Sequence, residues 1–334
     1  MKKDRKNAIA AFGLLALACG RTPLPAGRSL DHAEDRAQDR AQDHAEDRAQ
    51  DRAQDRVEDR AQDRVEDRAQ DHAEDRAQDR PQGPPPDVFR WRRIAGGTFE
   101  MGSFADGERA LPVHEVTVAD FDLTESEVTN AQYEACVTAG ACEPAHTLDA
   151  TCRRAERPGW PAEPLPDVFR APEAPVVCLD FAEVQRFAAW ADARLPTEAE
   201  WEFAARARGV EVDAPWGPAP VTCERAVMND AASGPGCGEG APAADCSRPA
   251  GRTAEGLCDM VGNVWDRVED YFHEDYTNAP TDGSAWLRPA TGRRVLRGGS
   301  WTNERSLMRV SLRGTGQEND RFDNLGFRLA RETP

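Results

Sequence analysis

The sequence predicts a mixed α+β domain with few helices and many loops, stapled by disulfides and preceded by a low-complexity tract. Three observations lead to this prediction. A tetrapeptide repeat fills residues 31–82, capping signals mark three short helices in the remainder, and eight cysteines lie between residues 136 and 258. The 334-residue chain leaves enough residues after the repeat for one domain with a sizeable core.

Residues 1–19 have the layout of a bacterial secretion signal. Basic residues at positions 2–6 precede the apolar run 8–18, which is too short to span a bilayer comfortably. Small Ala18 followed by Cys19 resembles a lipoprotein processing site. We therefore expect an exported protein, lipidated at Cys19 and anchored to a membrane of the bacterial envelope, either periplasmic or surface-exposed. Plain secretion is the alternative.

Residues 20–87 form a linker. Within it, thirteen copies of Asp-Arg/His-Ala/Val-Gln/Glu occupy residues 31–82, and a Pro-rich break at 83–86 ends the run. Arg and Asp three residues apart attract, but equal charges four residues apart repel, and there is almost no apolar stripe. The tract is either a solvated single helix or a disordered spacer. Both forms suit a tether that lifts a domain off a membrane.

The formal net charge of −18 excludes one class of partner. Nucleic-acid binding requires a basic patch that releases counterions from phosphates, and no such patch is present in the domain. We therefore expect no nucleic-acid partner.

The domain begins near Val88 and extends to residue 334. Residues 113–118 alternate polar and apolar side chains, as a half-buried strand does. Thr129 with Gln132 three residues later is a capping box, which predicts a helix through Val137. Asp180 and Glu183 repeat the signal for a helix over Val184–Ala191 with one apolar face.

A third helix start lies at Thr197. Pro196 stops the preceding segment, and Glu200 has the capping-box spacing from Thr197. Helical spacing places Trp201 and the alanines at 204 and 205 on one inward face. We expect this helix to end before Gly209.

An even number of cysteines in an exported chain indicates disulfides. We predict four local bridges: Cys136–Cys142, Cys152–Cys178, Cys223–Cys237 and Cys246–Cys258. The rival interpretation is a metal site, but no Cys-x-x-Cys spacing occurs and histidine is scarce.

Seven segments together resemble the formylglycine-generating enzyme (sulfatase-modifying factor) family, in the order found there. They are Gly97-Thr-Phe-Glu-Met-Gly-Ser103, Glu127-Val-Thr-Asn-Ala-Gln-Tyr133, Arg194-Leu-Pro-Thr-Glu-Ala-Glu-Trp201, Pro215-Trp-Gly217, Gly256-Leu-Cys-Asp-Met-Val-Gly-Asn-Val-Trp265, Arg297-Gly-Gly-Ser-Trp301 and Asn324-Leu-Gly-Phe-Arg328. The resemblance implies the fold of that family, which is related to C-type lectin-like domains.

The resemblance also implies a calcium loop. Residue by residue, it implies a side-chain oxygen from Asp259, carbonyls from Gly262 and Val264, and a carboxylate from Asp266. Mixed carboxylate and carbonyl oxygens are the ligands that calcium prefers. Asn229 is a weaker match to a ligand of the family's other calcium site.

The catalytic positions of the family differ in this chain. The resemblance implies that Trp265 and Ser300 line the substrate cleft. Members that oxidise cysteine to formylglycine hold copper(I) between two cysteines after the Gly-Gly-Ser turn, and by spacing these positions are Asn303 and Met308. Soft copper(I) prefers thiolates, which an amide and a thioether do not replace.

We therefore expect a catalytically degenerate member of the family, without bound copper, that uses a calcium-stabilised domain to bind a peptide or another cell-surface ligand. One alternative is an oxidoreductase that modifies a secreted protein, either of the sulfatase-activating type or with a divergent metal site. The other is a structural tether of the envelope.

Overall fold

The computed structural model describes residues 83–85, 88–155 and 163–333. The chain divides into two units at residue 80, and the description concerns the second, residues 80–334. The expected signal, the lipidation at Cys19 and the repeat tract therefore lie outside the described residues. Within these residues, every helix is too short or too polar to cross a membrane.

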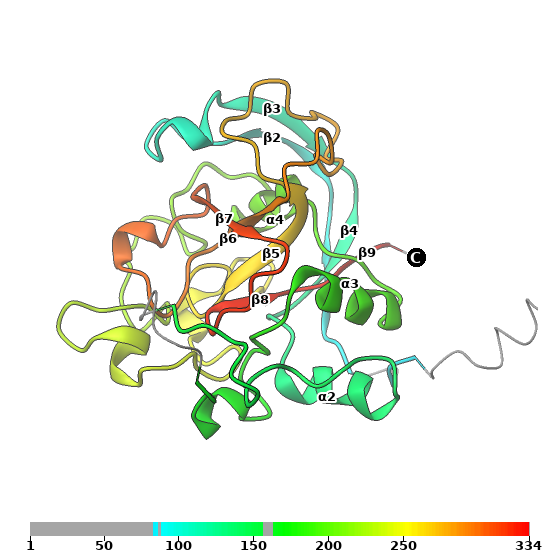
Figure 1. Cartoon of the computed structure of the whole chain (residues 1–334). Coiled ribbons are helices and arrows are strands. Elements are labelled where there is room, and N and C mark those ends of the chain that lie inside the picture. Colours follow the sequence, from blue (N-terminus) through cyan, green and yellow to red (C-terminus); the bar gives the residue numbers. More distant parts are fainter. Residues whose placement is uncertain (1–82, 86–87, 156–162, 334) are drawn as a thin grey trace, which may run out of the picture. The chain divides into compact units, whose positions relative to one another are not determined.

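A four-stranded sheet forms the centre of the domain, with the strand order β7-β6-β5-β8 (Figure 1). Its strands are β5 (Trp265–Tyr271), β6 (Arg293–Arg297), β7 (Arg313–Gln317) and β8 (Leu325–Phe327). The pairs β7–β6 and β6–β5 are antiparallel, whereas β5 and β8 run parallel. Most side chains of β5 and β6 are buried, which matches strands covered on both faces.

Two smaller sheets use the N-terminal strands. β1 (Trp91–Ile94), β4 (Phe121–Thr124) and β9 (Ala330–Glu332) form an antiparallel sheet with β4 in the middle. β2 (Gly97–Met101) pairs with β3 (His114–Val118), which confirms the strand predicted over 113–118. The last strand of the chain thus lies beside one of the first.

Three α-helices begin where their capping boxes predict. They are α2 (Asn130–Thr138), α3 (Phe181–Trp190) and α4 (Glu198–Ala205). At each start the side chain of the N-cap residue accepts a hydrogen bond from the backbone N–H three residues later. The side chain of that later residue, a Gln or Glu, accepts a hydrogen bond from the backbone N–H of the N-cap residue. Short 3₁₀ segments occupy the loops at Glu108–Ala110, Asp167–Arg170, Pro235–Gly238, Pro249–Gly251 and Arg305–Leu307.

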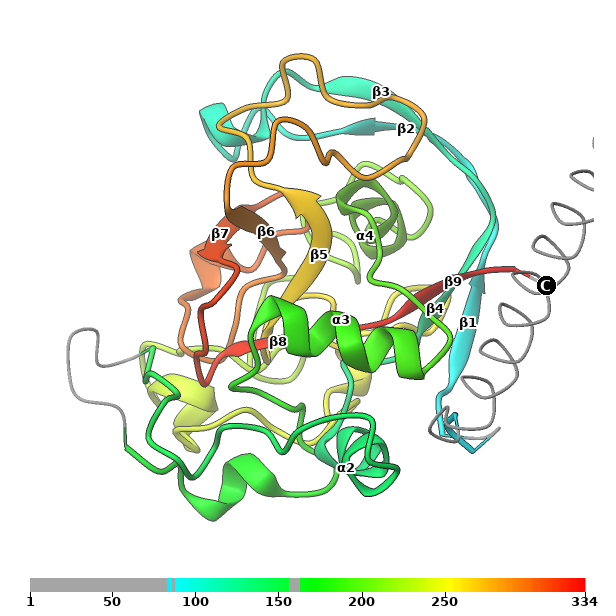
Figure 2. The ribbon, with the colours of Figure 1, turned by 45° about the vertical axis from the view of Figure 1, so that its right-hand side comes forward.

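The burial of α4 differs from the prediction. We expected one inward face, but every residue from Glu198 to Ala205 is buried. The helix lies between the β2–β3 hairpin and the central sheet (Figure 2). Its glutamates are neutralised by arginines: Arg313 donates to Glu198 at 2.7 Å, and Arg297 and Arg206 bind Glu202. The acidic face is therefore internal because distant arginines reach it.

Four disulfides join loops of the domain. They are Cys136–Cys142, Cys152–Cys178, Cys223–Cys237 and Cys246–Cys258, the four pairs that the sequence predicts. Each bridge closes a local loop, with a sequence separation of at most 26 between the two cysteines. Together with three hydrophobic clusters they fix a domain in which loops outnumber regular elements.

Candidate functional site

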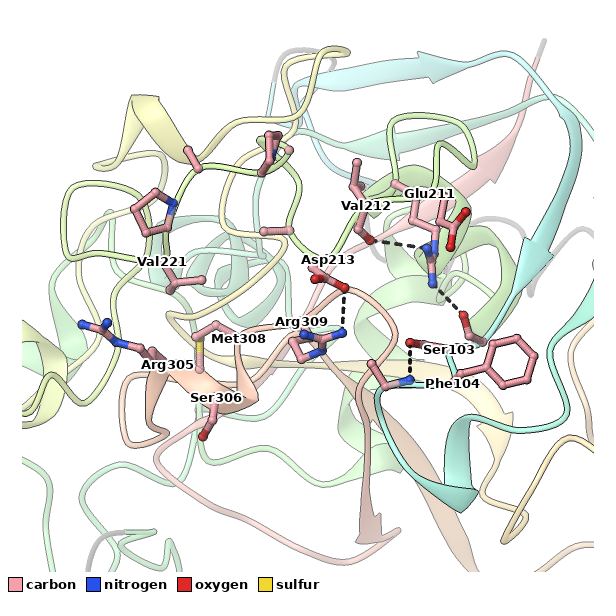
Figure 3. A pocket seen from close by; sticks show the side chains of 18 of the residues that line it. Ser103, Phe104, Glu211, Val212, Asp213, Val221, Arg305, Ser306, Met308 and Arg309 are labelled. Atoms are coloured by element: carbon pink, nitrogen blue, oxygen red, sulfur yellow. Dashed lines mark hydrogen bonds and ion pairs between the residues drawn. The ribbon is translucent and has the colours of Figure 1, made fainter.

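A groove of about 980 Å³ lies where three loops meet. Residues 102–105, 211–221 and 305–309 supply most of its lining (Figure 3). The wall from Pro218 to Val221 is largely apolar, and Met308 faces it from the opposite loop. This combination of a concave shape, apolar walls and a few charges is typical of a ligand site.

Ion pairs hold the three loops in place. Arg309 donates to Asp213 at 2.6 Å and also pairs with Asp106. The N–H of Val310 bonds to the carbonyl of Asp213 at 3.0 Å. Arg206 donates to the Gly102 carbonyl at 2.8 Å, so the 102–105 loop is tied to the end of α4. The groove is therefore fixed by charges rather than by regular structure.

Two side chains in the groove are free to meet a ligand. Phe104 is 83% exposed, which is unusual for an aromatic residue in a folded domain. The exposed side chain of Arg305 takes part in no hydrogen bond or ion pair with any residue the structure describes. Figure 3 shows these two side chains at opposite ends of the groove, so only an occupant that spans the groove would contact both the ring and the guanidinium.

The turn after β6 contains Ser300 and the two positions, Asn303 and Met308, at which the resemblance places the copper ligands of the family. Ser300 is fully buried, and its Oγ donates to Asn303 Oδ1 at 2.7 Å. Asn324 Nδ2 in turn donates to Ser300 Oγ at 3.1 Å. The Asn303 amide oxygen is therefore already used within the turn. Met308, at the other end of the turn, is buried in the largest hydrophobic cluster.

The two expected cleft residues do not line this groove. Trp265 is half-buried and packs over Gly314, where a Cβ would lie 2.9 Å from its ring. Ser300 bonds inward to Asn303 and Asn324, as described above. The groove beside Met308 and the surface around Trp265 are thus separate features of the described domain.

The expected calcium loop contributes to a buried acidic cluster. Asp266 Oδ2 accepts from Arg328 Nε at 2.6 Å and from Trp201 Nε1 at 2.8 Å. Asp259 Oδ2 accepts from the N–H of Cys246 at 2.8 Å. Glu127 accepts from the N–H of Val264 at 3.2 Å and from the side chain of Asn263.

The electrostatics of this cluster favour an additional positive charge. Burial raises the pKa of Asp266, and raises the pKa of Asp259 to about 6. Burial and the charges of Asp259 and Asp266 raise the pKa of Glu127 well above its usual value. Arg328 is the cation that opposes all three shifts. Arg328 thus acts on all three carboxyl groups, and Arg248 adds a second positive charge beside Asp259.

The types of donor atom in this set, two carboxylates and two backbone carbonyls, are those that calcium prefers. Asp266 Oδ1 is buried and has no hydrogen-bond partner, and such an orphaned oxygen is costly without a cation. Gly262 has a φ of +88° and comes close to the Val227 carbonyl, so the loop can bend as a ligand loop must. Asp259, Asp266 and the two carbonyls at 262 and 264 would hold the ion, which would neutralise the buried carboxylates.

The hydrogen bonds that the structure gives Asn229 do not involve the carboxylates of this cluster. Its N–H donates to the carbonyl of Asn303 at 2.8 Å, and it bridges to Glu304 as a short parallel pair. This contact joins the 229 loop to the turn that carries Asn303. The structure therefore gives Asn229 a positioning contact, and no described carboxylate bonds to its side chain.

Comparison with known proteins decides the family. Residues 75–333 match the family model of the sulfatase-modifying factor enzyme 1-like domain. The chain belongs to the formylglycine-generating enzyme family. This result confirms the resemblance and the mixed, loop-rich fold that it implies.

Relatives within the formylglycine-generating enzyme family differ in what they are named for. The formylglycine-generating enzyme of Streptomyces coelicolor is 31% identical over 295 residues, covering 72% of this chain and 88% of its own. Inactive C-alpha-formylglycine-generating enzyme 2 of Bos taurus is 29% identical over 274 residues, covering 71% and 86%. Among solved structures, PvdO from Pseudomonas aeruginosa superposes with a TM-score of 0.59 and 29% identity, covering 73% and 94%.

Several residues of the site escape prediction from sequence. Glu127 and Arg328 lie at the ends of family motifs, yet their closeness to Asp266 follows only from the fold. Phe104, Arg305 and the apolar wall at 218–221 come from three loops with no shared signal. The isolated hydrophobic Phe104 within a polar loop was the one hint available in the sequence.

Proposed function

We propose that this protein is a ligand-binding member of the formylglycine-generating enzyme family that lacks copper-dependent oxidation of cysteine. The observation that carries the proposal is the turn between Ser300 and Met308. If the spacing from the Gly-Gly-Ser turn holds, the two copper positions are Asn303 and Met308. The first is an amide whose oxygen bonds to Ser300, and the second is a buried thioether.

No thiolate among the described residues is available to replace them. The eight cysteines of the domain are joined in four disulfides. Copper(I) prefers soft sulfur ligands, and of the two positions only the Met308 thioether could supply one, weakly, whereas the Asn303 amide could not. One relative, from Bos taurus, is named as an inactive formylglycine-generating enzyme. Its name is consistent with a family fold that persists without the activity.

The occupant that the groove best suits is a peptide in an extended conformation. Phe104 supplies an aromatic surface, the wall at 218–221 supplies an apolar one, and Arg305 supplies a cation. A spanning segment with apolar side chains against Phe104 and the wall, and a carboxylate at the Arg305 end, would satisfy all three. The neighbouring charges of Arg309 and Asp213 bind each other and hold the loops in place.

The groove proposal is tested with peptide-display selection on the full chain. Selected peptides should be enriched in apolar residues with Asp or Glu at one end. Phe104→Ala and Arg305→Gln should each weaken binding about tenfold, whereas Leu148→Ala, which removes an exposed apolar side chain outside the groove, should not. Equal binding by all three variants would place the ligand elsewhere.

The oxidase question is tested separately. The full chain is titrated with copper(I) and incubated with a cysteine-containing peptide under oxygen. We expect no tight copper binding and no aldehyde in the peptide. Formation of the aldehyde would overturn the proposal in favour of the oxidoreductase that modifies a secreted protein.

We further propose calcium as the ligand of Asp259, Gly262, Val264 and Asp266, and export with a lipid anchor at Cys19. The first rests on the buried acidic cluster, and the second on the N-terminal sequence. Membrane fractionation of cells expressing the wild type and Cys19→Ser tests the anchor: the wild type should sediment with membranes and the variant should not. Deleting residues 31–82 tests the structural-tether alternative, which requires a changed cellular phenotype.

A further inference from the structure

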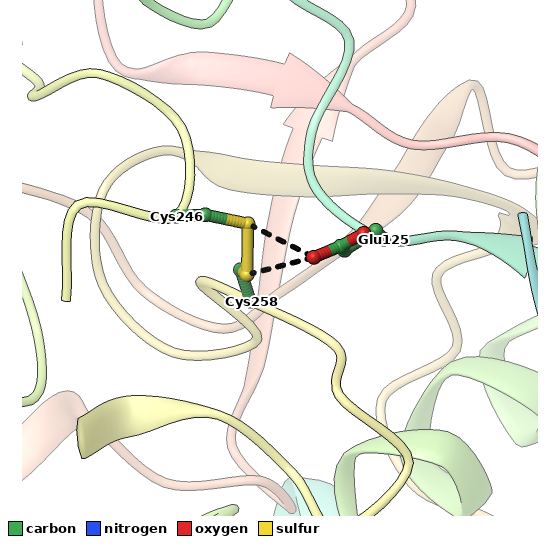
Figure 4. A group of neighbouring side chains, drawn as sticks. All are labelled: Glu125, Cys246 and Cys258. Atoms are coloured by element: carbon green, nitrogen blue, oxygen red, sulfur yellow. Dashed lines mark hydrogen bonds between the residues drawn. A yellow bond between two sulfur atoms is a disulfide. The ribbon is translucent and has the colours of Figure 1, made fainter. Parts of the chain in front are cut away.

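The Cys246–Cys258 disulfide faces the carboxylate of Glu125 (Figure 4). Oε1 of Glu125 lies 3.8 Å from Sγ of Cys246 and 4.0 Å from Sγ of Cys258. The ligand atoms of the three side chains all lie within 4.8 Å of one another. A disulfide has no hydrogen to donate, so this carboxylate oxygen gains nothing from the oxidised sulfurs. Two thiols or thiolates would interact with it far better.

We propose that Glu125, Cys246 and Cys258 form a binding site for a zinc-type divalent ion when this disulfide is reduced. Zinc binds sulfur at ~2.3 Å and carboxylate oxygen at ~2.0 Å in a tetrahedron, which separates the two ligand atoms by roughly 3.5 Å. The two sulfur–oxygen distances in the oxidised protein are already close to this value.

A modest movement completes the geometry. Two sulfur ligands of a tetrahedral zinc ion lie roughly 3.8 Å apart, whereas the disulfide holds them at 2.02 Å. Cys258 is buried, and its N–H bonds to the carbonyl of Glu125 at 2.7 Å, so it stays in place. Cys246 is half-buried in a loop, and because its N–H bonds to Oδ2 of Asp259, its side chain rather than its backbone is what moves.

The surrounding charges suit an anionic ligand set. Arg92 donates to Oε2 of Glu125 at 2.9 Å, and Arg252 Nη1 lies 3.4 Å from Oε1. Arginine contacts of this kind orient a ligating carboxylate and stabilise neighbouring thiolates. Two thiolates and one carboxylate carry three negative charges, which one divalent ion and the two arginines offset.

The reduction step requires an external dithiol. Its two S–H groups become one disulfide, and the bond between Cys246 and Cys258 breaks as each sulfur gains one electron and one proton. Zinc binding then releases both thiol protons to solvent. With three protein ligands, the fourth position of the tetrahedron goes to water.

The test uses cobalt(II) as a coloured substitute for zinc. The full chain is treated with dithiothreitol without denaturant, desalted under argon and titrated with cobalt(II), and alkylation with peptide mapping identifies the free thiols. We expect free Cys246 and Cys258, one cobalt ion per chain and a sulfur-to-cobalt charge-transfer band. Failure of dithiothreitol to open this disulfide would overturn the proposal, as would free thiols without that band.

Matched variants separate this site from other metal binding. The Cys246→Ser/Cys258→Ser double variant should lose the band, while Cys136→Ser/Cys142→Ser should keep it. Glu125→Gln should retain the band but lower cobalt affinity at least tenfold. The thermal transition of each oxidised variant reports whether it is folded. If Glu125→Gln bound cobalt with unchanged affinity, the carboxylate would not be a ligand. A sulfur-to-cobalt charge-transfer band in the Cys246→Ser/Cys258→Ser variant would refute the proposed site.

Discussion

Arg313 on β7 donates two hydrogen bonds to the carboxylate of Glu198 at the start of α4, from Nε at 2.7 Å and from Nη2 at 2.9 Å. Both side chains are almost fully buried, and Tyr276 donates a third bond to the same carboxylate at 3.0 Å. The pair joins two segments 115 residues apart. It therefore links the helix to the central sheet.

Replacing Glu198 should destabilise the domain strongly. Glu198→Gln leaves Arg313 without its buried carboxylate partner and leaves Arg297 with Glu202 alone, and we expect a loss of about 3 kcal/mol in the free energy of unfolding. Urea denaturation measures it. Asp120→Asn, which breaks an exposed pair with Arg93, serves as the control and should leave the urea midpoint almost unchanged. Equal effects of the two variants would contradict the importance of burial.

Calcium should raise the melting temperature. Saturating calcium at about 100 times its dissociation constant would add ~2.7 kcal/mol to the stability, and a chelator should remove this gain. Asp266→Asn should abolish the calcium response because it replaces the carboxylate whose Oδ1 is buried without a partner. Differential scanning calorimetry measures the shift. A wild type that melts at the same temperature with calcium and with chelator would exclude the site.

Two cysteines introduced into the turn should create copper binding. The Asn303→Cys/Met308→Cys double variant supplies the thiolate pair that copper(I) prefers, and it also frees Ser300 Oγ from its bond to Asn303. We expect one copper(I) ion per chain, measured by competition with a chromophoric chelator. Asn303→Cys alone, with one thiolate, should bind much more weakly. Wild type that competes as well as the double variant would show another copper site.

The free energy of unfolding should decrease as the pH rises from about 4 to about 7, because of the carboxyl group of Asp270. Burial raises the pKa of this carboxyl from 3.8 to about 7, and the charge of Glu198 adds to the shift. The folded state therefore holds a proton that the unfolded chain has released, so the free energy of unfolding decreases as the pH rises through this range, by at most about 4 kcal/mol.

The variant Asp270→Asn isolates that contribution. Its amide does not titrate, so its free energy of unfolding should depend less on pH than that of wild type across the same range. Urea titrations of both proteins at several pH values give the difference in slope. Identical slopes would mean that Asp270 ionises normally, whatever the absolute loss of stability caused by the amide.

Local features of the fold could be predicted from sequence, because their signals lie within a few residues. Thr129, Asp180 and Thr197 cap helices through contacts three residues away. The disulfides were also predictable as nearest neighbours, because each joins cysteines in one loop or across a short connection.

Long-range features could not be predicted in the same way. Glu202 resembles a solvent-exposed residue in the sequence, yet Arg297, 95 residues away, neutralises it in the core. The groove combines three loops whose closeness depends on ion pairs such as Arg309–Asp213. For the candidate site, the resemblance gave the calcium residues, while Glu127 and Arg328 became visible only once the chain was folded.

The pairing of β9 with β4 has a consequence for how the chain matures. Residues 330–332 supply the final strand of a sheet whose other members are formed before residue 125. That sheet cannot close until β9 has been synthesised, so β4 keeps an unpaired edge while the residues between 125 and 330 emerge. Truncation of the chain before residue 330 would leave that edge open permanently, and the product would be prone to pair with other chains.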